Sequence, residues 1–145
     1  MTKQTALLSA PTSSLLIEVV NGALVICHWG APILGQNHDI ALASRVSIAN
    51  SSWDEPQLPG LMRESSRGFL GRGSLSGHRN GKAWSTKFEV TDFHHQDNHC
   101  AVTLRDFHAE LEVAVTFDLD AFGVLIQKAS VKFIGYLYHK RQHKL

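Results

Sequence analysis

Two pairs of carboxylates have a spacing that could support hydrolytic chemistry. Glu110/Glu112 and Asp118/Asp120 are i,i+2 pairs, which put two like charges on one face of a β-strand. A hydrolase that works through two carboxyl groups needs them positioned together, with the pKa of one raised for general acid catalysis. The two glutamates instead lie opposite an apolar row, as on a solvated strand face, and the two aspartates bracket a hairpin end, where Asp is favoured. We therefore predict no catalytic residue in this chain.

Metal and cofactor chemistry has one candidate segment each. His94-His95-Gln96-Asp97-Asn98-His99-Cys100 is rich in imidazole and contains a thiol, the ligands that zinc prefers. It joins two strand-like runs, so we interpret it as a polar hairpin loop without a metal. Gly71-Arg72-Gly73 lacks the strand–loop–helix setting of a phosphate cradle. The sequence predicts neither a metal nor a cofactor.

The three tryptophans, Trp29, Trp53 and Trp84, could stack on the face of a sugar ring. Large aromatic side chains more often pack in a core or at an interface between domains, and we favour this for all three. Trp29 ends a strand beside Gly30, and of the three it is the one that we most expect to contact a ligand. We retain it as a candidate substrate-binding residue.

The elements that would position these residues are strands. Two apolar runs at 15–20 and 23–29 flank Asn21-Gly22, two residues that tolerate the positive φ of a type I′ hairpin turn. Apolar and polar residues alternate around 87–90 and 102–105 and along 110–119, and a last strand is expected from about 124 to 133. No helical periodicity of useful length is present. The pattern predicts an all-β fold, an antiparallel β-sandwich of the supersandwich type.

A long segment from about Arg45 to Lys82 does not fit this alternation. It is rich in Gly, Ser and Pro and carries isolated large side chains, namely Trp53, Leu58, Leu61, Met62, Phe69 and Leu75. Irregular connections beyond about 12–15 residues are uncommon in compact domains and are often functional. The segment either folds over its own sandwich or packs on a missing domain or a neighbouring subunit. Under the second hypothesis, these apolar side chains lack cover.

Composition limits the possible partners. The 145 residues suffice for one domain, and the net charge is +1. Without the basic tail residues Lys140, Arg141 and Lys144, 11 basic side chains stand against 13 acidic ones, which argues against nucleic acid as a partner. No apolar stretch is long enough to span a membrane, and the N-terminal one is too short for a signal peptide. The two cysteines, Cys27 and Cys100, make no disulfide framework, so we expect a cytoplasmic protein.

Three stretches in order resemble a known domain. The first is Asn21-Gly22-Ala23-Leu24 followed by His28-Trp29-Gly30-Ala31-Pro32-Ile33. The second is Pro56-Gln57-Leu58-Pro59, then a Gly-rich loop from Gly68 to Arg79 that ends in Gly-His-Arg. The third is the strand series from Trp84 to Ile134. Together they are similar to the N-terminal β-sandwich of glycoside hydrolase family 36.

The resemblance implies part of a retaining α-galactosidase. Members carry two catalytic aspartates in a (β/α)8 barrel, which this chain lacks, so we expect it to be inactive alone. The domain would contact its own missing catalytic barrel or neighbouring subunits in a homo-oligomer. Asp39 and Arg45, together with Trp29, are the candidate contacts to an α-galactoside.

The resemblance also suggests domain limits. Residues 1–13 are expected as an N-terminal extension, 14–134 as the β-sandwich domain, and 135–145 as a basic tail unlike the family. Such a tail would suit a frameshifted, truncated or artificially ended reading frame. Two alternatives remain: a stand-alone carbohydrate-binding module, with aromatic side chains aligned on one face, and an interaction domain without sugar contact.

Overall fold

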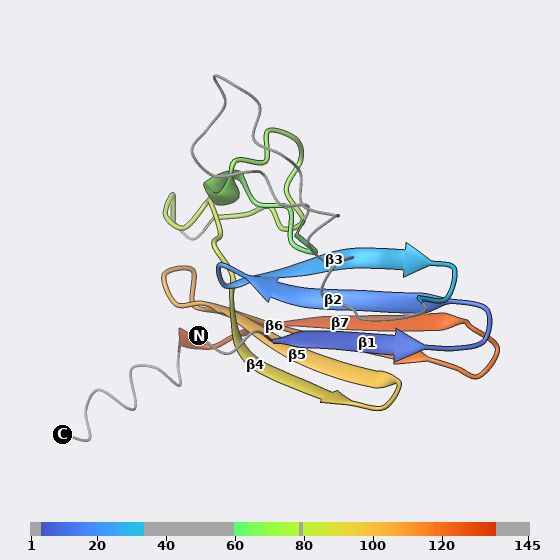
Figure 1. The fold of residues 1–145 in the computed structure, drawn as a ribbon. Coiled ribbons are helices and arrows are strands. Elements are labelled where there is room, and N and C mark those ends of the chain that lie inside the picture. Colours follow the sequence, from blue (N-terminus) through green and yellow to red (C-terminus); the bar gives the residue numbers. More distant parts are fainter. Residues whose placement is uncertain (1–3, 34–59, 79, 136–145) are drawn as a thin grey trace.

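The chain folds as two antiparallel sheets, which confirms the predicted all-β sandwich (Figure 1). The computed structural model describes residues 4–33, 60–78 and 80–135. Within them the first sheet has the order β1-β2-β3 and the second the order β4-β5-β6-β7. The elements are β1 (Thr5–Ser9), β2 (Ser14–Val20), β3 (Ala23–Gly30), the 3-10 helix η1 (Ser65–Arg67), β4 (Glu89–Gln96), β5 (His99–Asp106), β6 (Leu111–Leu119) and β7 (Leu125–Phe133).

The predicted hairpin at Asn21-Gly22 is confirmed. The two residues have φ values of 49° and 77°, and they join β2 to β3 with Val20 opposite Ala23. Positive φ at both central positions is what a two-residue turn needs to match the twist of its strands. The turn sets the register that buries Ile17 and Leu24, while Leu15 is buried beyond an irregularity that shifts the pairing between Leu16 and Ile17.

The first sheet begins earlier than the sequence indicated. Thr5–Ser9, within the expected N-terminal extension, is strand β1 and pairs with β2 from Thr5 opposite Glu18 to Ser9 opposite Ser14. Ala6 and Leu8 are fully buried, while Thr5, Leu7 and Ser9 are half-buried or exposed. Successive side chains of a strand point to opposite faces, so Ala6 and Leu8 lie together on the face toward the core. The expected basic tail lies outside the described residues except for Gly135, and its separation from the domain stays a prediction.

The second sheet supplies the larger share of the core. β5, and β6 from Glu112 onward, alternate between buried and half-buried side chains, and the two strands pair without a shift from His99 opposite Asp118 to Asp106 opposite Leu111. Their buried rows meet those of β1–β3, which form the opposite layer. The core is made of Ala6, Leu8, Leu15, Ile17, Leu24, Phe88, Cys100, Val102, Leu104, Val113, Val115, Phe117 and Leu119.

The two layers are joined at both ends. At one end, Val90 N–H donates to the carbonyl of Gly22 at 2.8 Å, which brings β4 to the β2–β3 turn. At the other end, Thr12 Oγ1 donates to the Phe122 carbonyl at 2.9 Å and Ser13 Oγ to the Gly123 carbonyl at 3.0 Å. The β1–β2 turn therefore clasps the β6–β7 turn. No helix among the described residues is long and apolar enough to cross a membrane.

Candidate functional site

The irregular segments collect at one end of the sandwich. We call residues 60–78 and 80–86 the loop face; Figure 1 shows them in green to yellow-green above β3, on the side of the β2–β3 turn. Gly60 bridges antiparallel to Val25, and Leu61 N–H donates to the Leu24 carbonyl at 2.8 Å, so the loop face starts alongside the first residues of β3. This attachment favours the first hypothesis, in which the segment folds over its own sandwich.

The expectation that the apolar side chains of this segment lack cover is partly wrong. Leu61, Met62 and Leu75 are partly buried and pack against the core, and Phe69 is also half-buried. The irregular spacing of these residues in the sequence does not indicate their burial, because a loop that turns back on itself can bury a side chain without a regular alternation. Trp53 and Leu58 lie outside the described residues. Leu70 and Trp84 are the exposed large apolar side chains of the loop face, at 85% and 73% exposure.

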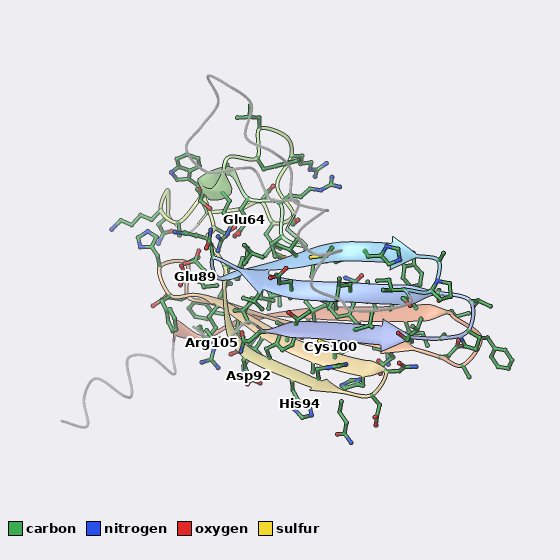
Figure 2. The ribbon with its side chains drawn as sticks, viewed as in Figure 1. Glu64, Glu89, Asp92, His94, Cys100 and Arg105 are labelled. Atoms are coloured by element: carbon green, nitrogen blue, oxygen red, sulfur yellow. The ribbon has the colours of Figure 1, made fainter. Side chains whose placement is uncertain are left out.

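An ion pair that the sequence analysis missed fixes the loop face to both sheets. Glu64 is only 4% exposed; its Oε1 accepts the Phe88 N–H at 2.8 Å and its Oε2 accepts Arg67 Nε at 3.1 Å. Arg67 also donates to the carbonyls of Phe88 at 2.7 Å and Asn21 at 3.2 Å. Figure 2 shows Glu64 where the loops meet the sandwich. Its only sequence signal is the i,i+3 spacing of opposite charges around Ser65-Ser66.

Burial raises the pKa of Glu64 above its ordinary value. Desolvation disfavours the carboxylate, while the Phe88 N–H and the Arg67 guanidinium favour it without fully compensating. A carboxyl with a raised pKa can mark a catalytic acid. The partners of Glu64 are a backbone amide and an arginine within the protein, so the arrangement holds three segments together.

The Gly-rich loop is ordered by contacts around Arg63. Arg63 N–H donates to Ser74 Oγ at 2.8 Å, and Ser74 N–H donates to the Arg63 carbonyl at 2.9 Å. The Arg63 guanidinium lies 5.6 Å from the centre of the Phe69 ring, a cation–π distance. A Cβ at Gly71 would lie 2.7 Å from that ring, so glycine there permits the close return of the chain.

Of the candidate sugar-contact residues, Trp29 lies among the described residues. Trp29 lies near the end of β3, is 48% exposed and pairs across the sheet with Leu15. Asp39 and Arg45 lie outside the described residues, so their role as α-galactoside contacts stays a prediction. Trp84 is not a core residue, because its side chain is largely exposed on the loop face.

The carboxylates proposed as possible dyads have separate partners. Glu112 Oε2 accepts from the Arg105 guanidinium at 2.7 Å, whereas Glu110 lies in the preceding turn with φ of 55°. Asp118 Oδ1 lies 2.5 Å from His99 Nδ1, and Asp120 Oδ1 accepts the N–H groups of Phe122 and Val124 in the β6–β7 turn. The preference of Asp for turns indicates the role of Asp120, whereas Glu110 lies in the turn before β6 and not on the strand face where the alternation places it.

The histidine-rich segment forms the expected hairpin, but with a turn shorter than the sequence suggests. β4 runs to Gln96 and β5 starts at His99, so only Asp97 and Asn98 form the turn, and Asp97 has φ of 51°. His95 Nε2 contacts the Asp97 carbonyl at 3.0 Å, and Figure 2 shows His94 pointing away from the sandwich. Across residues 4–33, 60–78 and 80–135, no three His, Cys, Asp or Glu side chains group as metal ligands.

Both cysteines are free thiols. Cys100 is buried between the sheets, and burial raises the pKa of its thiol to about 11. At neutral pH it is therefore protonated and acts as a small apolar core residue. Cys27 is half-buried on β3, and its Sγ lies 3.8 Å from Glu18 Oε2.

The fold and the loop face define an antiparallel β-sandwich domain. The family model described as the glycosyl hydrolase family 36 N-terminal domain matches residues 22–135. The chain belongs to this family. The match begins at the β2–β3 turn and ends just after β7, so it takes in the loop face and the whole second sheet.

A relative of known name supports the same assignment. The chain is 29% identical over 118 residues to a protein named alpha-galactosidase from Escherichia coli. The similarity covers 81% of this chain but 16% of the relative, so the chain spans a minor part of that protein's length. No solved structure matches the chain.

Proposed function

We propose that this chain is the N-terminal structural and assembly domain of an α-galactosidase, and that it is catalytically incompetent by itself. The observation that carries the proposal is the family match over residues 22–135. The named relative extends it to α-galactosidase, whose full-length form would hydrolyse terminal α-galactosides with retention. The carboxylates Glu64, Glu112, Asp118 and Asp120 support incompetence, because each is engaged by a structural partner.

In this role the loop face would contact the catalytic barrel of the enzyme or a neighbouring subunit. Its anchor through Glu64 and Arg67 makes it a stable platform, and the exposed Leu70 and Trp84 offer apolar area to a partner. Trp29, Asp39 and Arg45 are the proposed contacts to an α-galactoside at the border of the active site. The free thiols support the expected reducing compartment, the cytoplasm.

An activity assay tests the proposal. The purified 145-residue chain should release no p-nitrophenol from a p-nitrophenyl α-galactoside above a buffer control, while a full-length α-galactosidase assayed alongside does. Activity that copurifies with the chain and disappears in Asp118→Ala or Glu112→Ala would overturn it.

A second candidate function is a stand-alone carbohydrate-binding module. The exposure of Trp29, at 48%, favours it, because a half-exposed indole can stack on a sugar. Titration calorimetry with galactose separates the two: the isolated assembly domain should show no binding heat. Saturable binding that Trp29→Ala removes would instead support the module.

A further inference from the structure

Two Asn-Gly dipeptides lie in turns of nearly the same backbone shape. Asn21 and Gly22 have φ values of 49° and 77°, and Asn80 and Gly81 have φ values of 49° and 76°. Glycine has no side chain, so its backbone nitrogen is open to the side chain of the asparagine before it. A difference in reactivity between the two dipeptides must therefore come from what surrounds them.

The reaction open to an Asn-Gly dipeptide is ring closure. The backbone nitrogen of the glycine attacks the side-chain amide carbon, the new C–N bond completes a five-membered imide, and the side-chain nitrogen leaves as ammonia. The attacking N–H must lose its proton, so a base within hydrogen-bond reach of it promotes the step. Water then opens the imide at either carbonyl and leaves aspartate or isoaspartate. The net reaction consumes one water and releases one ammonia.

The Asn21-Gly22 turn is held on several sides. Arg67 Nη1 donates to the Asn21 carbonyl at 3.2 Å, and Val90 N–H donates to the Gly22 carbonyl at 2.8 Å. The turn also closes the ladder between β2 and β3. A Cβ added at Gly22 would lie 3.4 Å from Glu89 Cγ, so little space surrounds the glycine. Ring closure requires the peptide between the two residues to rotate, and these contacts oppose the rotation.

The Asn80-Gly81 turn has a base at the reacting nitrogen and open space around it. Gly81 N–H donates to His78 Nδ1 at 3.2 Å, so this ring nitrogen carries the lone pair that accepts the proton. Nothing lies within 4 Å of a Cβ added at Gly81. Asn80 and Gly81 are both exposed, so water has access to an imide formed there.

We propose that Asn80 is a self-modification site, at which His78 acts as general base and the asparagine is converted to aspartate or isoaspartate. His78 Nδ1 takes the proton of the Gly81 N–H as the Gly81 nitrogen bonds to Asn80 Cγ. The imidazolium then returns the proton to the nitrogen that leaves as ammonia. Water is the only further reactant. The proposal rests on this turn and holds whether or not the chain serves an α-galactosidase.

The product changes the charge of the loop face. Within the described part of this surface, Glu64 is the only acidic residue and is bound by Arg67, whereas Arg63, Arg72 and Lys82 are basic. A carboxylate at position 80 lowers the charge of the surface by one, and isoaspartate also lengthens the backbone of the turn by one carbon. The conversion thus alters the surface proposed for assembly.

Mass spectrometry of the full 145-residue chain, incubated at neutral pH for increasing times, measures the conversion. Cleavage after glutamate gives the peptide 65–89, in which Asn80 is the only asparagine, and the peptide 19–55, in which fragmentation locates Asn21. Conversion at Asn80 should be faster than at Asn21 by at least about tenfold. In the chain unfolded by urea the two rates should approach each other, because the fold creates the difference.

His78→Gln tests the base. Glutamine keeps an acceptor for the Gly81 N–H but does not take its proton, so conversion at Asn80 should slow by at least about tenfold. The rate at Asn21 in the same sample should stay unchanged, which shows that the variant is folded. The matched control is His94→Gln, which removes another exposed imidazole and should change neither rate. A rate at Asn80 that His78→Gln does not lower, or conversion at Asn21 as fast as at Asn80 in the folded chain, would overturn the proposal.

Discussion

At the scale of single residues, the clearest feature is that burial decides the role of a carboxylate. The i,i+2 pairs that attracted attention in the sequence are partly exposed and bind Arg105, His99 or turn amides. Glu64, which has no conspicuous motif, is nearly inaccessible and organises the loop face. An ionised group in such a place is tolerated only with partners, and both of its oxygens have one.

The raised pKa of Glu64 predicts how the fold responds to pH. Since the folded-state pKa lies above the ordinary value of 4.5, Glu64 contributes stability below about that pH and loses it as the pH rises through the raised pKa. Glu64→Gln imitates the protonated form at every pH. Its free energy of unfolding relative to the wild type should therefore increase from acid to neutral pH, measured by urea denaturation at a series of pH values.

The matched control is Glu112→Gln, which also removes an arginine-bound carboxylate but from the outer face of β6. The trend must be specific to Glu64 to support the assignment. A Glu64→Gln curve parallel to that of the wild type across the whole pH range would contradict it.

At the scale of elements, the turns determine how the strands come together. Positive φ at Asn21 and Gly22 sets the β2–β3 register, and the β6–β7 turn is held from outside by Thr12 and Ser13. The second contact joins residues 110 positions apart, so it ties one sheet to the other. The turn at Gly123 thus contributes to the closure of the sandwich as well as to its own hairpin.

Gly123→Ala should be strongly destabilising. Gly123 has φ of 86°, and an added Cβ would clash with Thr12 and lie 2.8 Å from Ser13 Oγ. Gly81→Ala is the control, because Gly81 has φ of 76° but nothing within 4 Å of the added atom. We expect about 1 kcal/mol of lost stability for the control, from backbone strain alone, and about 3 kcal/mol for Gly123→Ala. Equal losses of stability for the two variants in thermal or urea unfolding would show that the contacts of Thr12 and Ser13 with the β6–β7 turn contribute nothing.

At the scale of the whole molecule, the apolar surface is distributed differently from the sequence expectation. Leu61, Met62 and Leu75 turn inward, while Leu70 and Trp84 of the loop face stay exposed. Burying one such large side chain stabilises an association by roughly 1.5–3 kcal/mol. Two of them on one anchored surface make the loop face the proposed site of assembly.

The chain should therefore form a homo-oligomer through the loop face. Light scattering should give a mass above the 16.0 kDa of the single chain, rising with concentration. Leu70→Ser/Trp84→Ser should restore the monomer. Phe122→Ser should not, although Phe122 is as exposed as Leu70, because it lies on the β6–β7 turn. A wild-type monomer at every concentration would count against assembly and would favour the stand-alone module.

The sequence by itself determined the strands and most of their turns. Alternation along 110–119, the Asn21-Gly22 pair and the hairpin end at Asp118 and Asp120 are local signals, and each predicts an element that the structure contains. The short strand Thr5–Ser9 escaped, because five residues carry too little periodicity and its place depends on pairing with β2. The order of motifs along the chain was also sufficient to indicate the family.

Only the tertiary structure decided which side chains are buried, paired or left at an edge. The Glu64–Arg67 pair has meaning only because Phe88 and Asn21 come from distant segments to meet it. The core likewise depends on which strands face one another, and β1 packs against β5 and β6. Burial and edge exposure are properties of how elements pack, and a periodic pattern specifies a face without specifying what lies over it.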